Sequence, residues 1–376
     1  MLLVTGCPLW LMSLGIYVHL PFCRVHCTYC AFAISTDLAR EDAYVEALVR
    51  EVTGAADRQQ PVTTLYYGGG TPSRMSIENL SRVTSTIRSA FNVSPDAEFS
   101  MESNPEDIGD ASLRGWRELG VNRLSIGVQS FADAELLPLG RIHGGEGARA
   151  AVAAAVAAGF RTNLDLILGL PGQTRHSFLE TLETAVNLGV GHVSLYMLDL
   201  EQGSPLAVQV ERGRAALPDD SLVADLYIEA IELLEAGGLH QYEISNFARA
   251  GEECLHNLRY WTRLPYRGLG LGAHSFMEGR RFANTRDIRR YIENAPAAAD
   301  FSELLGADEE RRETLFLGLR QTGGIDYERI ARLCGQEGIE WMDRGLRDGW
   351  LRRAGERVAF TPAGFLLSNE YISQLF

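Results

Sequence analysis

The sequence contains no lysine: all 35 of its basic residues are arginine. Without lysine the chain cannot form a Schiff base with pyridoxal phosphate, hold nucleotide phosphates with a P-loop lysine or use a lysine general base. Acidic residues number 49, so the formal net charge is −14 and binding to nucleic acid is not expected. A charge of this sign also disfavours contact with anionic membrane surfaces.

Long apolar runs are also missing. The longest covers residues 150–160, is rich in alanine and is too short to span a membrane. Residues 4–7 resemble a lipoprotein cleavage box, but no basic residue precedes Arg24, so we expect no working signal and a cytoplasmic protein. We interpret residues 1–14 as a leader that results from a start codon assigned too far upstream. Met12 is then the alternative first residue to Met1.

Short β-rich runs and helical patterns alternate from residue 15 to about residue 238. Several runs are apolar on successive residues, as strands buried on both faces are. The predicted strands cover residues 16–20, 64–67, 98–102, 123–128, 162–168 and 192–197. Helical spacing lies between them, for example over residues 44–52 and 221–236. The alternation predicts an α/β fold, an open partial (β/α)6 barrel over residues 15–238, with its chemistry at the carboxyl ends of the strands.

The alternation is lost after residue 238. Glycine clusters in residues 268–272, Pro296 with three alanines indicates a linker, and we expect residues 239–300 to extend the barrel. Residues 301–376 show two helical patterns and then a hairpin around Gly355, which predicts a small winged-helix-like α+β domain. This region carries 10 arginines and 13 acidic residues, so a packing or substrate-lid role is favoured over nucleic-acid binding.

Three of the six cysteines, Cys23, Cys27 and Cys30, lie within eight residues of one another, directly after the first predicted strand. A disulfide framework would need pairs of cysteines in a small secreted chain. Thiolates are soft anionic ligands, and three of them suit a 4Fe–4S cluster that keeps one iron open to a further ligand. Zinc is the alternative, and it would need a fourth ligand such as His19 or His26.

This cysteine loop, placed after a first barrel strand, resembles that of the radical S-adenosylmethionine superfamily. In that superfamily the open iron binds the amino and carboxylate groups of the methionine moiety, and an electron from the cluster cleaves the sulfonium to a 5′-deoxyadenosyl radical. The segment Gly-Gly-Gly-Thr-Pro at residues 68–72 resembles the superfamily's motif after the second strand. Bare glycines let backbone groups approach a ligand closely, although a tight turn would also explain them.

Within the superfamily the chain resembles the coproporphyrinogen-dehydrogenase-like branch. That resemblance implies polar contacts to S-adenosylmethionine from residues near the ends of successive strands. The implied cofactor-binding residues are Tyr17, Tyr29, Gly69, Gly70, Thr71, Glu102, Gln129, Arg141 and Asp165. Taken singly, each polar residue can instead be a fold-holding ion pair or a strand-end cap. Asp165 lies inside an apolar strand and must find a partner there in either case.

Residues 256–261 carry the pattern His-Asn-x-x-Tyr-Trp, which resembles a signature of the heme chaperones in this branch. A histidine nitrogen can ligate heme iron, and aromatic rings offer flat apolar faces to a macrocycle. The resemblance therefore implies heme contacts from His256, Asn257, Tyr260 and Trp261. The alternative is that His256 is an interior histidine with satisfied hydrogen bonds and that the aromatic residues belong to the core.

Two features separate dehydrogenases from chaperones in this branch. The dehydrogenases carry a further cysteine two residues after the third cluster ligand, where this chain has Phe32, and an N-terminal arm, where this chain has fifteen residues before its first predicted strand. We therefore expect a heme chaperone of porphyrin metabolism that uses a 4Fe–4S cluster and S-adenosylmethionine. Its expected partners are heme, an electron donor and an apo-hemoprotein client. The client can be a membrane protein.

Two alternatives to a chaperone stay open. One is a coproporphyrinogen III dehydrogenase that decarboxylates propionates oxidatively, although Phe32 and the missing arm make this oxidase activity unexpected. The other is an iron–sulfur-dependent binding scaffold that never cleaves its cofactor. The intact glycine segment and Glu102 argue against a scaffold, because a scaffold need not keep a ligand pocket.

Overall fold

The computed structural model describes residues 13–376. Residues 1–12, with Cys7 and the alternative start Met12, lie outside the described part, and Leu14 is already the first residue of β1. Among the helices of the described residues, none is long and apolar enough to cross a membrane.

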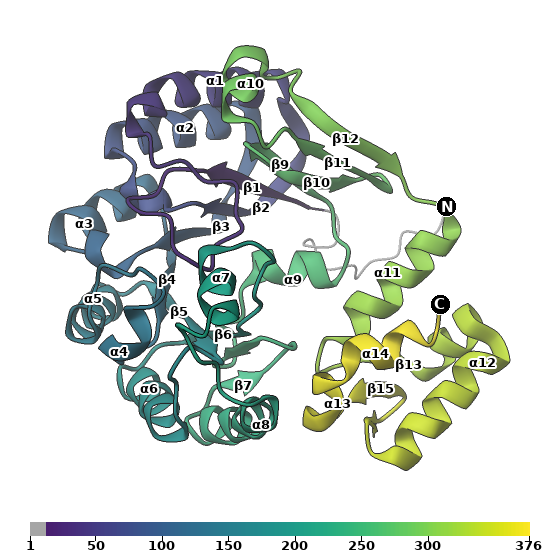
Figure 1. Ribbon diagram of the computed structural model, residues 1–376. Coiled ribbons are helices and arrows are strands. Elements are labelled where there is room, and N and C mark those ends of the chain that lie inside the picture. The colour runs from purple at the N-terminus through teal and green to yellow at the C-terminus, as the bar shows by residue number, and fades with distance from the viewer. Residues whose placement is uncertain (1–12) are drawn as a thin grey trace, which may run out of the picture.

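A twelve-stranded sheet forms the body of the protein, in the order β12-β11-β10-β9-β1-β2-β3-β4-β5-β6-β8-β7 (Figure 1). Six neighbouring strands, β1 to β6, pair in parallel and in chain order. They are Leu14–Leu20 (β1), Asp57–Gly69 (β2), Phe91–Ser103 (β3), Arg123–Gln129 (β4), Arg161–Leu168 (β5) and His192–Met197 (β6). The six predicted strands and the predicted α/β architecture are thus confirmed.

Two of these strands start earlier than predicted. β2 begins at residue 57 and β3 at residue 91, seven residues before the predicted starts at 64 and 98. The extra residues pair with each other, as Asp57 with Phe91 and Val62 with Val93 show. Most of them are partly or fully exposed, so no continuous apolar run indicates the extension.

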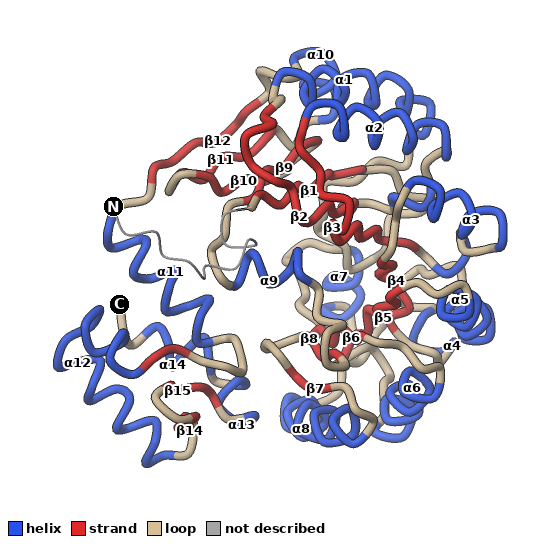
Figure 2. The backbone as a smooth tube through the Cα atoms, turned by 180° about the vertical axis from the view of Figure 1, so that it is seen from behind, coloured by secondary structure: helices blue, strands red, loops and turns tan. Residues whose placement is uncertain are grey.

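Helices connect the parallel strands, and most of them lie on the outside of the curved sheet (Figures 1 and 2). They are α1 (Glu41–Gly54), α2 (Ile77–Ala90), α3 (Asp110–Leu119), α4 (Asp133–Leu136), α5 (Gly145–Ala157), α6 (Arg175–Asn187), α7 (Pro205–Glu211) and α8 (Asp220–Ala236). The short helix α7 lies instead on the side nearest the reader in Figure 1, together with the loop that follows β1. That side carries the carboxyl ends of the parallel strands.

Beyond β6 the sheet grows at both edges. The added elements are β7 (His240–Gln241), β8 (Asn246–Ala248), α9 (Leu255–Trp261), β9 (Tyr266–Gly270), β10 (His274–Met277), β11 (Arg280–Asn284), α10 (Ile288–Asn294) and β12 (Ala299–Leu304). β9 pairs in parallel with β1, and β10 to β12 follow antiparallel. The glycine cluster is therefore the end of β9 and its turn: a Cβ at Gly268 would lie 2.1 Å from the His274 carbonyl oxygen.

Two details of the predicted organisation are wrong here. The boundary placed at residue 301 falls inside β12, which pairs with β11 and so belongs to the large sheet. All six residues of β12 are exposed, so the strand leaves no apolar pattern in the sequence. The predicted linker around Pro296 is a packed loop, because Ala295 and Ala298 are buried.

The C-terminal module follows the predicted order of two helices and a hairpin. Its elements are α11 (Ala307–Leu319), β13 (Ile325–Asp326), α12 (Tyr327–Asp348), β14 (Leu351–Ala354), β15 (Arg357–Phe360), α13 (Pro362–Leu366) and α14 (Ser368–Ser373). Trp341, Phe360 and Tyr371 form its aromatic core, and the Trp341 indole donates to the Tyr371 carbonyl at 2.8 Å. Backbone hydrogen bonds from Ile244 and Thr322 join the module to the barrel near β7.

Candidate active site at the carboxyl ends of the strands

A cavity of about 470 Å³, the upper cavity, opens where β1 to β6 end. It brings together residues from the loop after β1, the glycine segment after β2 and the ends of four further strands. The predicted site residues that line it are Cys23, Cys27, Tyr29, Cys30, Gly69, Gly70, Thr71, Glu102, Gln129, Arg141 and Asp165. Tyr17 lies one level below, stacked on Tyr66 with ring centroids 6.1 Å apart.

The three thiols of the cysteine loop are free and partly exposed. Thr71 Oγ1 donates to Cys23 Sγ at 3.4 Å, and Arg141 Nη1 donates to Cys27 Sγ at 3.6 Å. Burial raises the pKa of the Cys23 thiol to about 11. This thiol is therefore neutral at pH 7 when no metal is bound, and a metal must displace its proton.

The thiols fit a 4Fe–4S cluster better than a single ion. In residues 13–376 no three His, Cys, Asp or Glu side chains are arranged to hold one metal ion. In the cubane each thiolate binds a different iron, so the thiols need not converge on one point. The histidines considered for zinc are engaged elsewhere: His19 Nε2 lies 2.8 Å from the Ala33 carbonyl oxygen, and His26 Nε2 lies 3.2 Å from that of Cys30.

The glycine segment packs so closely against the rest of the protein that side chains would not fit there, even without a ligand. Gly69 has φ +112°, and a Cβ there would lie 2.5 Å from the His19 ring. A Cβ at Gly70 would lie 2.5 Å from the Pro21 carbonyl carbon, and the Gly70 amide donates to the Leu20 carbonyl at 2.9 Å. The glycines therefore seat β2 against the start of the cysteine loop, as the tight-turn alternative anticipates, and they also line the cavity.

Two half-buried carboxylates, Glu102 and Asp165, face the cavity, and the described residues supply neither with an ion-pair partner. Glu102 accepts hydrogen bonds from the Gly69 amide at 2.9 Å and the Tyr66 hydroxyl at 3.1 Å. Burial, and next the neighbouring Asp165 carboxylate, raise the pKa of Glu102 to about 7. Burial also raises the pKa of Asp165 to about 6, although Ser125 donates to it at 3.0 Å. In residues 13–376 no basic side chain pairs with either one.

Uncompensated carboxylates in a cavity favour a cationic ligand, because such a ligand supplies the charge that burial removes from water. S-adenosylmethionine carries a sulfonium and an ammonium group and meets this requirement. Arg141 lines the same cavity; it donates to Asn104 Oδ1 at 2.8 Å and to the Gly127 carbonyl, while its buried Nε has no partner in the described residues. This spare N–H is suited to a carboxylate at the other end of the ligand.

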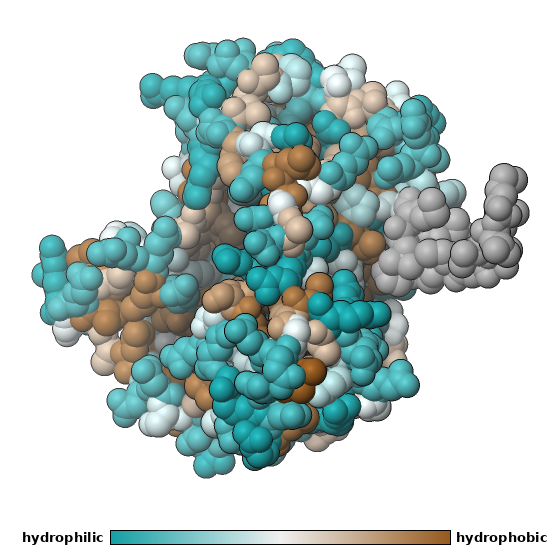
Figure 3. All heavy atoms as spheres, turned by 90° about the vertical axis from the view of Figure 1, so that its right-hand side faces the viewer, coloured by the Kyte–Doolittle hydropathy of each residue, from teal (hydrophilic) through white to brown (hydrophobic). Residues whose placement is uncertain are grey.

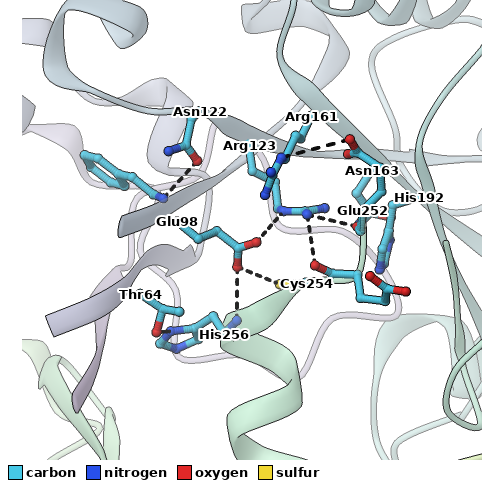
Figure 4. Close-up of polar contacts among 12 residues, drawn as sticks. Thr64, Glu98, Asn122, Arg123, Arg161, Asn163, His192, Glu252, Cys254 and His256 are labelled. Atoms are coloured by element: carbon cyan, nitrogen blue, oxygen red, sulfur yellow. Dashed lines mark hydrogen bonds and ion pairs between the residues drawn. The ribbon is translucent and has the colours of Figure 1, made fainter. Parts of the chain in front are cut away.

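A second, lower cavity of about 170 Å³ lies deeper in the barrel and shares Tyr66, Glu102, Ser125 and Tyr196 with the upper one. Arg123 lines it and forms a buried ion pair with Glu98 at 3.0 Å, shown in Figure 4.

This ion pair organises the segment before α9 (Figure 4). Glu98 accepts from the His256 amide at 3.0 Å and from the Cys254 thiol at 3.6 Å. Arg123 donates to the carbonyls of Glu252 at 2.9 Å and the next residue at 3.1 Å. Residues 252–256 are thereby attached to β3 and β4.

Three of the four residues predicted to contact heme, His256, Asn257 and Tyr260, line this lower cavity. Both ring nitrogens of His256 are engaged, Nδ1 with Thr64 Oγ1 at 2.8 Å and Nε2 with the Tyr260 hydroxyl at 2.9 Å. Burial lowers the pKa of His256 to about 3, and Asn257 donates to the buried carboxylate of Glu243 at 3.2 Å. His256 is thus an interior histidine with satisfied hydrogen bonds, and it cannot ligate iron in this arrangement.

Size leads to the same conclusion. Small-molecule sites usually measure about 300–1,000 Å³, so a cavity of about 170 Å³ is too small for a porphyrin. Tyr260 lines this cavity, whereas Trp261 lines neither cavity.

Sequence reasoning missed several polar residues that line the barrel interior. Together with Tyr17, His19, Glu102 and Asp165, which the sequence already singles out, they alternate with apolar residues along the strands: Thr64, Tyr66, Glu98, Arg123, Ser125, Asn163, His192 and Ser194. This period of two is a signal that the sequence carries, because residues i and i+2 of a strand share a face. It is easily overlooked because the same strands look like apolar runs buried on both faces.

Comparisons with known proteins agree with this geometry. Residues 17–185 match the model of the "Radical SAM superfamily". The chain is 38% identical over 372 residues to "Heme chaperone HemW" of Mycobacterium tuberculosis (strain ATCC 25618 / H37Rv), covering 96% of this chain and 94% of that one. It is 36% identical over 367 residues to the same-named protein of Bacillus subtilis (strain 168), covering 94% and 97%.

Among solved structures, "Coproporphyrinogen III oxidase (HemN) from Escherichia coli" is similar with a TM-score of 0.84 and 25% identity, over 97% of this chain and 90% of that one. The fold and the cysteine-lined cavity define a radical S-adenosylmethionine protein. Within that superfamily the chain belongs to the HemW family.

Proposed function

We propose that the protein binds heme and delivers it to an apo-hemoprotein, using a 4Fe–4S cluster and S-adenosylmethionine. The observation that carries the cofactor part is a single cavity lined both by three free thiols and by two carboxylates that have no ion-pair partner among residues 13–376. The heme part is supported by relatives named heme chaperones that cover almost the whole chain.

In this proposal Cys23, Cys27 and Cys30 hold the cluster, which supplies an electron to the cofactor when both are bound. Glu102 and Asp165 stabilise the positive charges of S-adenosylmethionine, and Arg141 pairs with its carboxylate. Thr71 and Arg141 also donate hydrogen bonds to cluster thiolates, which lowers the negative charge on sulfur and favours the reduced cluster. Tyr66 separates this site from the lower cavity.

A coproporphyrinogen dehydrogenase is the rival function, because the similar solved structure is a coproporphyrinogen III oxidase. The cysteine loop argues against it. Phe32 stands where the dehydrogenases carry a further cysteine, it is 68% exposed, and it lines the upper cavity. This protein therefore has an apolar ring at the point where a dehydrogenase site has a thiol.

Heme transfer tests the proposal. The reconstituted protein is loaded with one equivalent of heme under anaerobic conditions and mixed with an apo-cytochrome or with apo-myoglobin, which serves as a passive scavenger. We expect faster transfer to the apo-cytochrome than to the scavenger, because delivery requires contact with a client rather than release into water. Equal rates for both acceptors, or no heme bound at the start, would contradict the proposal. The proposal also includes an electron donor that reduces the cluster, and it allows a client hemoprotein at the membrane.

A further inference from the structure

Four large apolar side chains at the mouth of the upper cavity are exposed to solvent. Phe32 is 68% exposed, Ile142 50%, Tyr196 45% and Met197 41%, and all four line the cavity. They come from separate parts of the chain: the cysteine loop, the connection after β4 and the end of β6. We call this set the apolar rim. Single exposed apolar residues are ordinary, but several around one cavity indicate a binding surface.

The surface view agrees with this placement. Figure 3 shows the molecule from the side of the C-terminal module, and most of that face is hydrophilic. Apolar side chains gather toward its left edge, which is the side nearest the reader in Figure 1, where the cysteine loop and α7 lie. The cavity therefore combines two chemistries: polar and charged groups at its floor, and an apolar rim at its mouth.

A positive charge lies beside the rim. Arg286 is exposed, and its Nη2 donates to the carbonyl oxygen of Ala31, the residue before Phe32, at 2.9 Å. In the described part of the chain no carboxylate forms an ion pair with Arg286. The guanidinium is thus available to an external carboxylate. Two side chains that can ligate iron line the same cavity: the Met197 thioether, and the His26 imidazole through Nδ1, since its Nε2 contacts the Cys30 carbonyl oxygen.

We propose that the apolar rim and Arg286 form the docking site for heme, in place of the segment around His256. A metalloporphyrin has two flat apolar faces, an iron that accepts nitrogen or sulfur ligands, and carboxylates at one edge. This place offers apolar contacts, the two ligand types and an exposed arginine that forms no ion pair within the described residues, whereas the lower cavity is too small and its histidine is engaged. This inference rests on the proposed heme-binding function and specifies its site.

Equilibrium titration of heme, followed by its absorption band, tests the rim with matched variants. Phe32→Ala should weaken heme binding about 10- to 100-fold, because burying a large apolar side chain contributes about 1.5–3 kcal/mol. Arg286→Gln should weaken it by about fivefold or less, as expected for an exposed ion pair. The controls are Leu304→Ala on β12, 62% exposed, and Arg114→Gln on α3; neither residue lines the cavity, and both variants should bind heme like the parent.

Three outcomes distinguish this site from the proposed function. If the parent protein binds no heme, both the proposed function and the proposed docking site are contradicted. If the parent binds heme and Phe32→Ala and Arg286→Gln bind it equally well, the rim is overturned while the function stands. If these variants bind heme normally but lose transfer to the apo-cytochrome, the rim is a surface for the client protein and the heme site lies elsewhere. Retained cluster absorbance in each variant shows that the cysteine loop is intact.

Iron-free protoporphyrin IX, followed by its fluorescence, provides a second measurement on the same variants. Because the rim contacts the macrocycle and its carboxylates, Phe32→Ala should weaken binding of this probe by a factor similar to that for heme. A loss confined to heme would contradict contact between the apolar rim and the ring.

Discussion

Inward-facing residues of the strands line both cavities of the barrel, but the polar groups of the two cavities differ in whether they have charged partners. In the lower cavity the groups satisfy one another: Glu98 pairs with Arg123, and His256 is held by two hydroxyls. In the upper cavity Glu102 and Asp165 receive hydrogen bonds only from neutral groups, and their pKa values are raised to about 7 and about 6.

This difference separates structural from ligand-binding roles. A buried ion pair fixes the backbone around it when it also hydrogen-bonds to that backbone, as Glu98 and Arg123 do for the segment before α9. A buried charge without a partner destabilises the free protein and is offset only when a ligand supplies the missing charge. Residues of the same chemical type therefore have different roles one level apart in the barrel.

The largest effect should come from the cluster ligands. Cys27→Ala should abolish the visible absorbance of the reconstituted cluster, because each thiolate holds one iron. Cys254→Ala is the matched control in the lower cavity, and Cys334→Ala is a control in the C-terminal module; both should keep full iron content. Iron analysis after anaerobic reconstitution checks this. Equal iron loss in Cys254→Ala would show that the lower cavity also holds metal.

The lower cavity should respond through stability. Arg123→Met leaves Glu98 buried without its partner and should lower the free energy of unfolding by about 3–5 kcal/mol. The control is Arg82→Met, since Arg82 and Glu46 form an exposed pair at 3.8 Å, for which about 0–1 kcal/mol is expected. Urea unfolding of the two variants gives the comparison. Similar losses in both would mean that the buried pair does not attach α9 to the barrel.

The upper cavity should respond through ligand binding and pH. Because the pKa of Glu102 is raised to about 7, its carboxylate becomes charged between about pH 6 and 8, and affinity for S-adenosylmethionine should rise across that window. The same raised pKa should lower the free energy of unfolding of the free protein as pH rises from about 4.5 to 7, which is the opposite sign. Calorimetric titration at several pH values measures the first effect, and unfolding curves measure the second.

Glu102→Gln sharpens the pH prediction. Loss of the charge-assisted contact should weaken S-adenosylmethionine binding about 10- to 100-fold at pH 8 and flatten the pH dependence that Glu102 contributes. A remaining, smaller dependence near pH 6 is expected from Asp165. Unchanged affinity together with an unchanged pH profile would remove Glu102 from the binding site.

The smallest effect should be that of His256 on heme. His256→Ala should leave the heme absorption band and the heme affinity unchanged, because both ring nitrogens bond within the protein. It should lower the free energy of unfolding by about 1–3 kcal/mol, since Thr64 and Tyr260 lose a partner. Absorption spectroscopy and urea unfolding on one preparation separate these results. A shifted heme band would contradict the structural role and restore His256 as an iron ligand.

Much of the fold was predictable, because the six parallel strands carry apolar residues in nearly continuous runs. The outer strands were not: β12 is entirely exposed, so burial imposed no pattern on its residues. For the site, the cysteine loop was predictable because three thiols so close together in a large chain are typical of a metal centre. The role of His256 was not, because a sequence motif does not show whether Thr64 and Tyr260 occupy its nitrogens.

The most direct test of the proposed function is one anaerobic sample assayed for both heme binding and coproporphyrinogen III conversion. The protein is reconstituted with iron and sulfide, supplied with S-adenosylmethionine and a reductant, and divided between a heme titration and a turnover assay. A heme chaperone should give saturable heme binding near one equivalent and no protoporphyrinogen IX. Formation of protoporphyrinogen IX without saturable heme binding would contradict this account and identify a dehydrogenase.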